Sequence, residues 1–227
     1  MKKSYEVNLE DVIFRRAKEN DDTRQIAKLI YQTDPYIYPF WFNNSEKEAQ
    51  DFLEDKIKMP GFVFNYDNIY VAYDKKSEKI VGMIVAIDPS VNLDFDYKPY
   101  FINHNYEFTI NNYVKECIKE VKEGDSLYIM NCTVLDECRG RKIGTKLIGH
   151  FIGNMERAGF ENFSLDCLLH NLRAKNLYHS MGFKEIKEIV GFDGTDSSTV
   201  EVVSFKRHKG NYLPEEFQKK ENYPGLK

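Results

Sequence analysis

The chain lacks any long apolar run, and this absence limits the cellular locations in which we expect the protein. None of its 227 residues belongs to a window approaching the roughly 18 consecutive apolar residues of a membrane span. The basic residues Lys2 and Lys3 are followed by acidic residues, starting at Glu6, and not by the apolar stretch of a secretory signal. We therefore expect a soluble, cytoplasmic protein with no membrane partner.

An excess of positive charge is also missing. The formal net charge is −4 at pH 7, although 30% of the residues are charged. Nucleic-acid binding is dominated by phosphate contacts and needs a clearly basic footprint. We expect no nucleic-acid partner, and cationic ligands are electrostatically easier to bind.

Metal-binding and disulfide patterns are absent as well. The four cysteines show no CxxC spacing, and the five histidines show no metal-ligand spacing with cysteines or carboxylates. Such spacings are the usual sign of a zinc site or a disulfide framework. We expect reduced, mostly structural thiols and no metal.

Internal repeats and low-complexity linkers are missing too, so nothing in the sequence indicates a domain boundary. Residues 1–206 are expected to form one domain with an insertion at about 88–125. Residues 207–227 are lysine-rich and polar, and we expect them to form a C-terminal tail. A hydrophobic content of 42% is typical of a domain with a sizeable core.

The apolar spacing predicts the element order β-α-α-β-β-α-β-α-β-α-β-β. Strands are expected at 12–14, 69–73, 80–87, 127–134, 163–169, 185–191 and 199–205. Helices are expected at about 23–30, 45–59, 110–121, 143–155 and 172–181, and the aromatic stretch 31–42 is expected to be a packed loop. This order predicts an α/β fold, with a mixed central sheet and helices on both faces.

The segment Arg139-Gly140-Arg141-Lys142-Ile143-Gly144-Thr145 lies between an apolar strand and an amphipathic helix. A glycine- and arginine-rich turn at a helix N-terminus directs backbone N–H groups and the positive end of the helix dipole at one point. The turn is not a P-loop, because it lacks the Gly-Lys-Ser/Thr order. We expect it to bind a phosphate or pyrophosphate.

Three pieces together resemble the GNAT superfamily of acetyl-CoA-dependent N-acetyltransferases. They are the strand ending at Val134, the turn from Arg139 to Gly144, and the segment from Asn171 to Phe183. The last piece matches the family pattern Asn-x-x-Ala-x-x-Leu-Tyr-x-x-x-Gly-Phe closely. The resemblance covers about residues 127–183 and leaves 31–42 and 88–125 without a motif.

The resemblance implies an acyl-CoA-binding fold and acetyl transfer from acetyl-CoA to a primary amine by direct attack on the thioester. It implies that main-chain groups around Val134 hold the pantetheine arm. The expected cofactor-binding residues are Val134, Arg139, Gly140, Arg141, Lys142, Ile143, Gly144, Thr145 and Asn171. The acceptor is expected to be a small-molecule or peptide amine.

Lys142 departs from the family turn (Arg/Gln)-x-x-Gly-x-(Gly/Ala), whose middle position is glycine. A lysine there is expected to hold a backbone angle acceptable to a Cβ atom. Its ammonium can add attraction for phosphate.

Two residues are candidates for proton transfer. The resemblance implies that Tyr178 donates a proton to the departing thiolate, whereas helical spacing also allows simple packing with Ala174 and Met181. Asp166 lies in an apolar strand, where an unpaired carboxylate is costly to bury, so it is a candidate base. A salt-bridged or solvated Asp166 is the alternative.

Acceptor binding is expected to involve Asn131 and the aromatic loop residues Tyr36, Tyr38 and Trp41. Aromatic faces beside carboxylates suit a cationic amine, and residues 92–97 carry the same combination. The alternatives are a buried, hydrogen-bonded amide at Asn131 and rings that only cover the sheet edge and the helix of the insertion.

Two other functions remain open from the sequence. One is a catalytically silent acyl-CoA-binding domain that acts as a sensor or interaction module. The other is an α/β domain that binds a different nucleotide.

Overall fold

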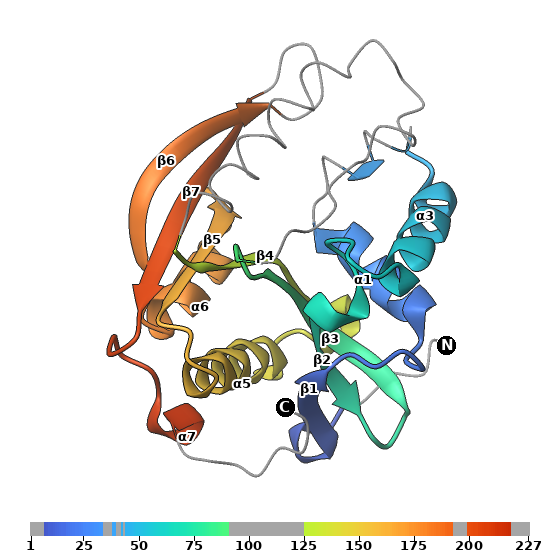
Figure 1. Cartoon of the computed structure of the whole chain (residues 1–227), viewed down its shortest axis with the longest axis horizontal. Coiled ribbons are helices and arrows are strands. Elements are labelled where there is room, and N and C mark those ends of the chain that lie inside the picture. The colour runs from blue at the N-terminus through green and yellow to red at the C-terminus, as the bar shows by residue number, and fades with distance from the viewer. Residues whose placement is uncertain are drawn as a thin grey trace.

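The computed structural model describes residues 7–33, 38–39, 42, 44–90, 125–192 and 199–218 (Figure 1). Tyr36, Trp41, the expected helix at 110–121 and the aromatic stretch 92–97 lie outside these residues. Up to residue 208 the described helices and strands follow the order expected from the sequence, and a further short helix at 215–218 was not expected.

The described strands form one sheet in the order β1-β2-β3-β4-β5-β7-β6. They are β1 (Val12–Arg16), β2 (Ile69–Asp74), β3 (Lys79–Ile87), β4 (Leu127–Val134), β5 (Asn162–Leu168), β6 (Lys184–Phe192) and β7 (Thr199–His208). Only β4 and β5 run parallel, and the other neighbours are antiparallel. The expected mixed α/β sheet is confirmed.

Helices cover both faces of the sheet, as Figure 1 shows. The α-helices are α1 (Thr23–Thr33), α3 (Glu46–Lys58), α5 (Ile143–Arg157), α6 (Leu172–Ser180) and α7 (Glu215–Gln218), and short 3-10 turns are η1 (Leu9–Asp11), η2 (Tyr66–Asn68) and η5 (Asp136–Cys138).

Helices α1 and α3 begin where the sequence places their caps. Asp22 accepts a bond from the Gln25 amide at 3.1 Å, and Ser45 accepts one from the Glu48 amide at 3.3 Å.

Alternating side chains on the strands divide the core into two clusters. Val71, Met83 and Val85 face α1 and α3, whereas Ala72 and Ile84 face α5. This alternation is the period of two expected for a sheet buried on both faces. The sheet is therefore the middle of three layers.

Strands β4 and β5 pair over only three residues each, Leu127–Ile129 with Phe163–Leu165. Both strands continue beyond this pairing. After Ile129 they separate, and the edge of β4 that faces β5 is no longer paired with it. The register of β3 with β4 also shifts between Val85 and Ala86, which re-aims the side chains that follow. The result is an opening in the sheet at the carboxyl ends of two parallel strands.

The expectation of a polar tail from Arg207 is wrong for residues 207–218. Strand β7 runs to His208, and the Arg207 side chain is fully buried, where it pairs with Glu156. Phe217 on α7 is also buried, against α5. The polar composition hid these contacts, because only a few residues of the segment, among them Arg207, Leu213 and Phe217, are buried.

Candidate active site

A cavity of about 520 Å³ lies at the opening between β4 and β5. The lining residues come from the end of β4, from the turn, from the start of α5 and from α6. They are Cys132, Thr133, Val134, Cys138, Arg139, Gly140, Lys142, Ile143, Gly144, Thr145, Asn171, Arg173, Ala174, Asn176, Leu177, Tyr178 and Ser180. The cavity thus joins both motifs identified in the sequence.

The turn before α5 presents backbone donors to this cavity. Lys142 is the N-cap of α5 with φ 62° and ψ 8°, and no side chain caps the helix. The first N–H groups of a helix have no partner within it, and the helix dipole makes this end positive. The geometry therefore fits an anionic group such as a pyrophosphate.

Lys142 adopts the left-handed backbone that favours glycine, contrary to the expectation for this position. A left-handed angle costs a residue with a Cβ about 1 kcal/mol. Gly140, two positions earlier, also has a positive φ of 81°. The turn keeps a glycine-like geometry even though a lysine occupies its middle position.

The two arginines of the turn differ in what they contact. The Nε of Arg139 donates to the Val134 carbonyl oxygen at 3.3 Å, and its guanidinium pairs with Asp136 at 2.7 Å. Arg141 donates to the Val7 carbonyl oxygen at 3.3 Å and is not among the residues that line the cavity. The structure thus brings together the expected cofactor-binding residues except Arg141.

Asn171 lines the cavity from the N-terminus of α6. Its side-chain oxygen accepts a bond from the Ala174 amide at 3.2 Å. It therefore caps α6, the helix that carries Tyr178.

Tyr178 both packs in the core and lines the cavity. Its ring makes edge contacts with Phe183 at 6.0 Å and Phe205 at 5.6 Å between centroids, and the residue is buried. It also lines the cavity. Burial raises the pKa of Tyr178 well above its usual value, so the phenol is protonated at neutral pH.

The cysteines of the cavity are protonated at neutral pH as well. Burial raises the pKa of Cys132 to about 12 and that of Cys138 to about 11. A thiolate, not a thiol, is the nucleophile of covalent catalysis. These two groups are therefore unsuited to form an acyl-enzyme.

Asp166 lies away from the cavity lining. Its carboxylate accepts bonds from Tyr128 at 2.9 Å and from Ser204. Tyr128 belongs to the cluster under α1 and α3, whereas the residues beside Asp166 on β5 face α5. The carboxylate is therefore on the α1 face of the sheet, held by hydroxyls of β4 and β7.

Asn131 is 7% exposed on the same face. Its Nδ2 donates to the Thr33 hydroxyl at 2.6 Å, and that hydroxyl donates to the Ile30 carbonyl oxygen at 2.6 Å. A hydroxyl has one hydrogen to donate, so Thr33 can only accept from Asn131. This fixes the amide orientation and leaves the buried Oδ1 without a hydrogen-bond partner in the described structure.

Tyr38 packs in the core and does not line an open binding surface. It is 4% exposed, and its ring packs in tilted contacts with Tyr31 and Phe64, at centroid distances of 6.3 and 6.5 Å. It belongs to the core under α1 and α3. For Tyr36 and Trp41, acceptor binding stays a prediction.

Several site residues were not identified from the sequence. Alternation along β4 is the signal that would have found Cys132, because it lies two positions before Val134 and so on the same face of the strand. Thr133 lies on the other face and has no such signal. Thr33, which orients Asn131, carries no such signal, since it lies 98 positions away along the chain.

Comparison with known proteins assigns the class. Residues 30–183 match the model of the acetyltransferase (GNAT) family, and this chain belongs to that family. No curated protein matches the chain.

Solved structures share the fold at low sequence identity. An N-acetyltransferase from Staphylococcus aureus is 20% identical, with a TM-score of 0.58 over 86% of this chain and 99% of that one. An agmatine N-acetyltransferase in its apo form is 16% identical, with a TM-score of 0.55 over 87% and 99%. A NatC complex bound to Gag peptide and CoA is 20% identical, with a TM-score of 0.50 over 87% and 98%.

In the part of the chain that the structure describes, no helix combines the length and the apolar character needed to cross a membrane.

Proposed function

We propose that this protein is an N-acetyltransferase that moves the acetyl group of acetyl-CoA to a primary amine by direct attack on the thioester. The observation that carries the proposal is the uncapped N-terminus of α5, which opens into a cavity at the parting of β4 and β5. Membership of the GNAT family supports the same reaction.

The pyrophosphate of CoA is proposed to bind at the turn. The backbone N–H groups of Ile143, Gly144 and Thr145 supply directed donors, and Arg139 and Lys142 supply positive charge. Asn171 on the far wall holds α6 in place. This arrangement suits a group with several negative charges.

The pantetheine arm is proposed to lie along the free edge of β4. Beyond Ile129 this edge has no pairing with β5, so main-chain groups on that side are available to an extended ligand. Cys132, Thr133 and Val134 line the cavity there. The thioester then comes close to Tyr178.

Tyr178 is proposed to assist departure of the CoA thiolate. Its phenol stays protonated because its pKa is raised, whereas a simple thiol has a pKa of about 8.5. Complete proton transfer to the thiolate is therefore uphill, and a hydrogen bond to the developing negative charge is the favoured form of assistance. The protonated Cys132 and Cys138 favour direct transfer over an acyl-cysteine.

The acceptor amine is proposed to approach from the α1 face. Asn131 presents an unpaired carbonyl oxygen there, and Asp166 is a proposed base or anchor for a cation. The aromatic residues Tyr36 and Trp41 are proposed to complete this side. A small-molecule or peptide amine that is positively charged before reaction suits such groups.

The experiment is release of free thiol from acetyl-CoA across a panel of amines, with mass spectrometry of the acetylated product. We expect amine-dependent thiol release. A silent acyl-CoA sensor would bind CoA with no turnover on any amine, and a domain for another nucleotide would show no thermal stabilisation by CoA.

A further inference from the structure

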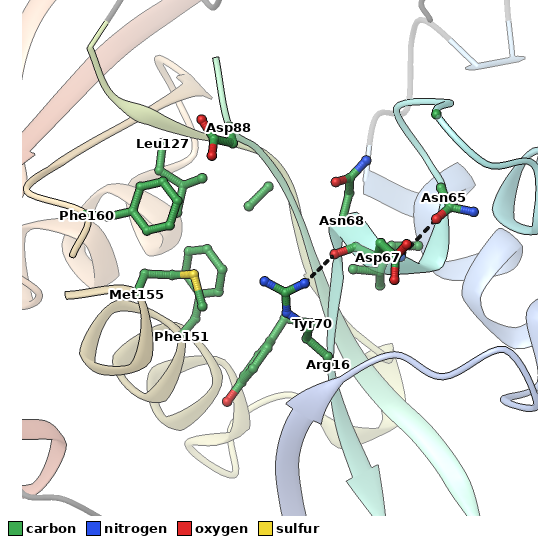
Figure 2. A pocket seen from close by; sticks show the side chains of 13 residues that line it. Arg16, Asn65, Asp67, Asn68, Tyr70, Asp88, Leu127, Phe151, Met155 and Phe160 are labelled. Atoms are coloured by element: carbon green, nitrogen blue, oxygen red, sulfur yellow. Dashed lines mark hydrogen bonds between the residues drawn. The ribbon is translucent and has the colours of Figure 1, made fainter. Parts of the chain in front are cut away.

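A second cavity, of about 320 Å³, lies at the other end of the sheet (Figure 2). It is lined by Leu127, the first residue of β4, whereas Val134 at the end of the same strand lines the candidate active site. Seven residue steps of about 3.3 Å separate the two ends by about 23 Å. The second cavity is therefore a separate site.

One wall of this cavity is apolar. Leu127, Phe151 and Met155 are buried, and the half-buried Phe160 completes the wall. Figure 2 shows these four side chains together on one side of the cavity. The volume is at the lower end of the range for small-molecule pockets, about 300 to 1,000 Å³.

The opposite wall carries Asn68 in a fixed orientation. Its Nδ2 donates to the carbonyl oxygens of Phe62 at 3.3 Å and Val63 at 3.1 Å. Because the NH₂ group faces two acceptors, the side-chain oxygen points away from them, and Figure 2 shows it turned toward the cavity. The wall therefore offers a hydrogen-bond acceptor.

Arg16 extends between the two walls (Figure 2). It donates to the Asp67 carbonyl oxygen at 3.3 Å, and no carboxylate in the described ranges lies within ion-pair distance of it. A guanidinium has five N–H donors, so most of them remain available. A single arginine suits one carboxylate rather than a polyphosphate.

We propose that this cavity binds a free α-amino acid with an apolar side chain. The carboxylate pairs with Arg16, the ammonium donates to Asn68 Oδ1, and the side chain packs against Phe151, Met155 and their neighbours. Asp88 on the rim adds a negative charge that favours an ammonium group. The inference is independent of acetyl transfer, because it involves neither the turn nor α6.

The first test is calorimetric titration of the whole protein with L-phenylalanine as the probe. Three analogues each lack one group: 3-phenylpropionate lacks the ammonium, 2-phenylethylamine the carboxylate, and glycine the apolar side chain. We expect saturable binding of L-phenylalanine and at least tenfold weaker binding of each analogue. Equal binding of an analogue, or no saturable binding of L-phenylalanine, would overturn the proposal.

A peptide end is distinguished by two blocked forms, N-acetyl-phenylalanine and phenylalanine amide. The proposal requires both free ends, so each blocked form is expected to bind at least tenfold more weakly. If a blocked form binds as well as the free amino acid, the site takes a peptide terminus and the proposal is wrong.

Variants locate the binding. Arg16→Gln removes the charge, and Ala86→Met fills the cavity from β3 while keeping the arginine. Each is expected to weaken L-phenylalanine binding at least tenfold and to leave CoA binding unchanged. Arg24→Gln, an arginine on α1 outside the cavity, is the matched control and is expected to bind like the unmodified protein. Unchanged binding in Arg16→Gln, a change at the cavity rim, would contradict the assignment even if Ala86→Met fails to fold.

Discussion

At the scale of single residues, Lys142 occupies the position where the turn pattern of the family has a glycine. The residue holds φ 62° at the N-cap of α5, a conformation that glycine adopts without strain. We expect Lys142→Gly to raise the free energy of unfolding by about 1 kcal/mol. We expect the same change to weaken CoA binding several-fold, because the ammonium beside the proposed pyrophosphate site is lost.

Glu78 provides the control, because it also has a left-handed angle, φ 56°, in the turn between β2 and β3. Glu78→Gly is expected to raise stability similarly in chemical denaturation and to leave CoA affinity unchanged. If Lys142→Gly binds CoA as tightly as the unmodified protein, the ammonium contributes nothing to the site.

Tyr178→Phe keeps the packed ring and removes the hydroxyl. If the hydroxyl stabilises the leaving thiolate, turnover should fall roughly 10²-fold while CoA affinity changes little. Because the pKa of Tyr178 is raised, the hydroxyl stays protonated through pH 10. Rate profiles of the unmodified enzyme should therefore show no loss from this group below pH 10. Nearly full turnover in the variant would assign Tyr178 to core packing alone.

Asn131 has a buried oxygen without a partner, and such an atom costs about 1 to 3 kcal/mol. Asn131→Leu is expected to leave the melting temperature unchanged or higher, since it removes this cost. Acceptor KM is expected to rise at least tenfold with acetyl-CoA KM unchanged. Thr33→Val, which frees the amide to rotate, should show a smaller rise in acceptor KM. A stable Asn131→Leu protein with unaltered acceptor kinetics would remove Asn131 from the acceptor site.

At the scale of elements, two glycines on α5 explain how α7 docks. A Cβ atom added at Gly149 would overlap the Phe217 ring, and one at Gly153 would overlap the Phe217 carbonyl oxygen. Alanine otherwise favours a helix over glycine by about 1 kcal/mol. We expect Gly149→Ala to destabilise the protein, and to stabilise it in a Phe217→Ala background, where the ring is absent. Additive effects in this double-mutant cycle, measured by denaturant unfolding, would contradict the docking.

Some elements of the fold could be predicted from the sequence, and others could not. Long amphipathic segments such as α5 and the hairpin of β2 and β3 were predicted, because apolar spacing encodes them locally. The docking of α7 was missed, because it depends on two small residues in another helix. The left-handed Lys142 was missed for a related reason: the surrounding turn imposes an angle that the residue type alone disfavours.

At the scale of the whole molecule, the cavity of the candidate active site lies where β4 and β5 separate. The sequence predicted both motifs that meet there, but not the shape of the opening, which depends on a register shift between β3 and β4. The sequence also carries no sign that the side-chain oxygen of Asn131 lacks a hydrogen-bond partner, because the orientation of this amide is set by the Thr33 hydroxyl on α1. The second cavity, at the other end of β4, has no local signal, because its lining residues come from segments far apart in the sequence.

The proposed binding of the CoA pyrophosphate at the N-terminus of α5 is tested most directly at Gly144. A Cβ atom at Gly144 would meet Val134 and Leu177 at ordinary distances of 3.6 and 3.8 Å, so Gly144→Ala is a control that should fold and bind. Gly144→Glu adds a negative charge where the phosphates are proposed to bind. By calorimetry, CoA affinity should fall at least tenfold in Gly144→Glu, about 1.4 kcal/mol, and change little in Gly144→Ala. A folded Gly144→Glu protein that binds CoA with unchanged affinity would show that the pyrophosphate does not bind at the N-terminus of α5.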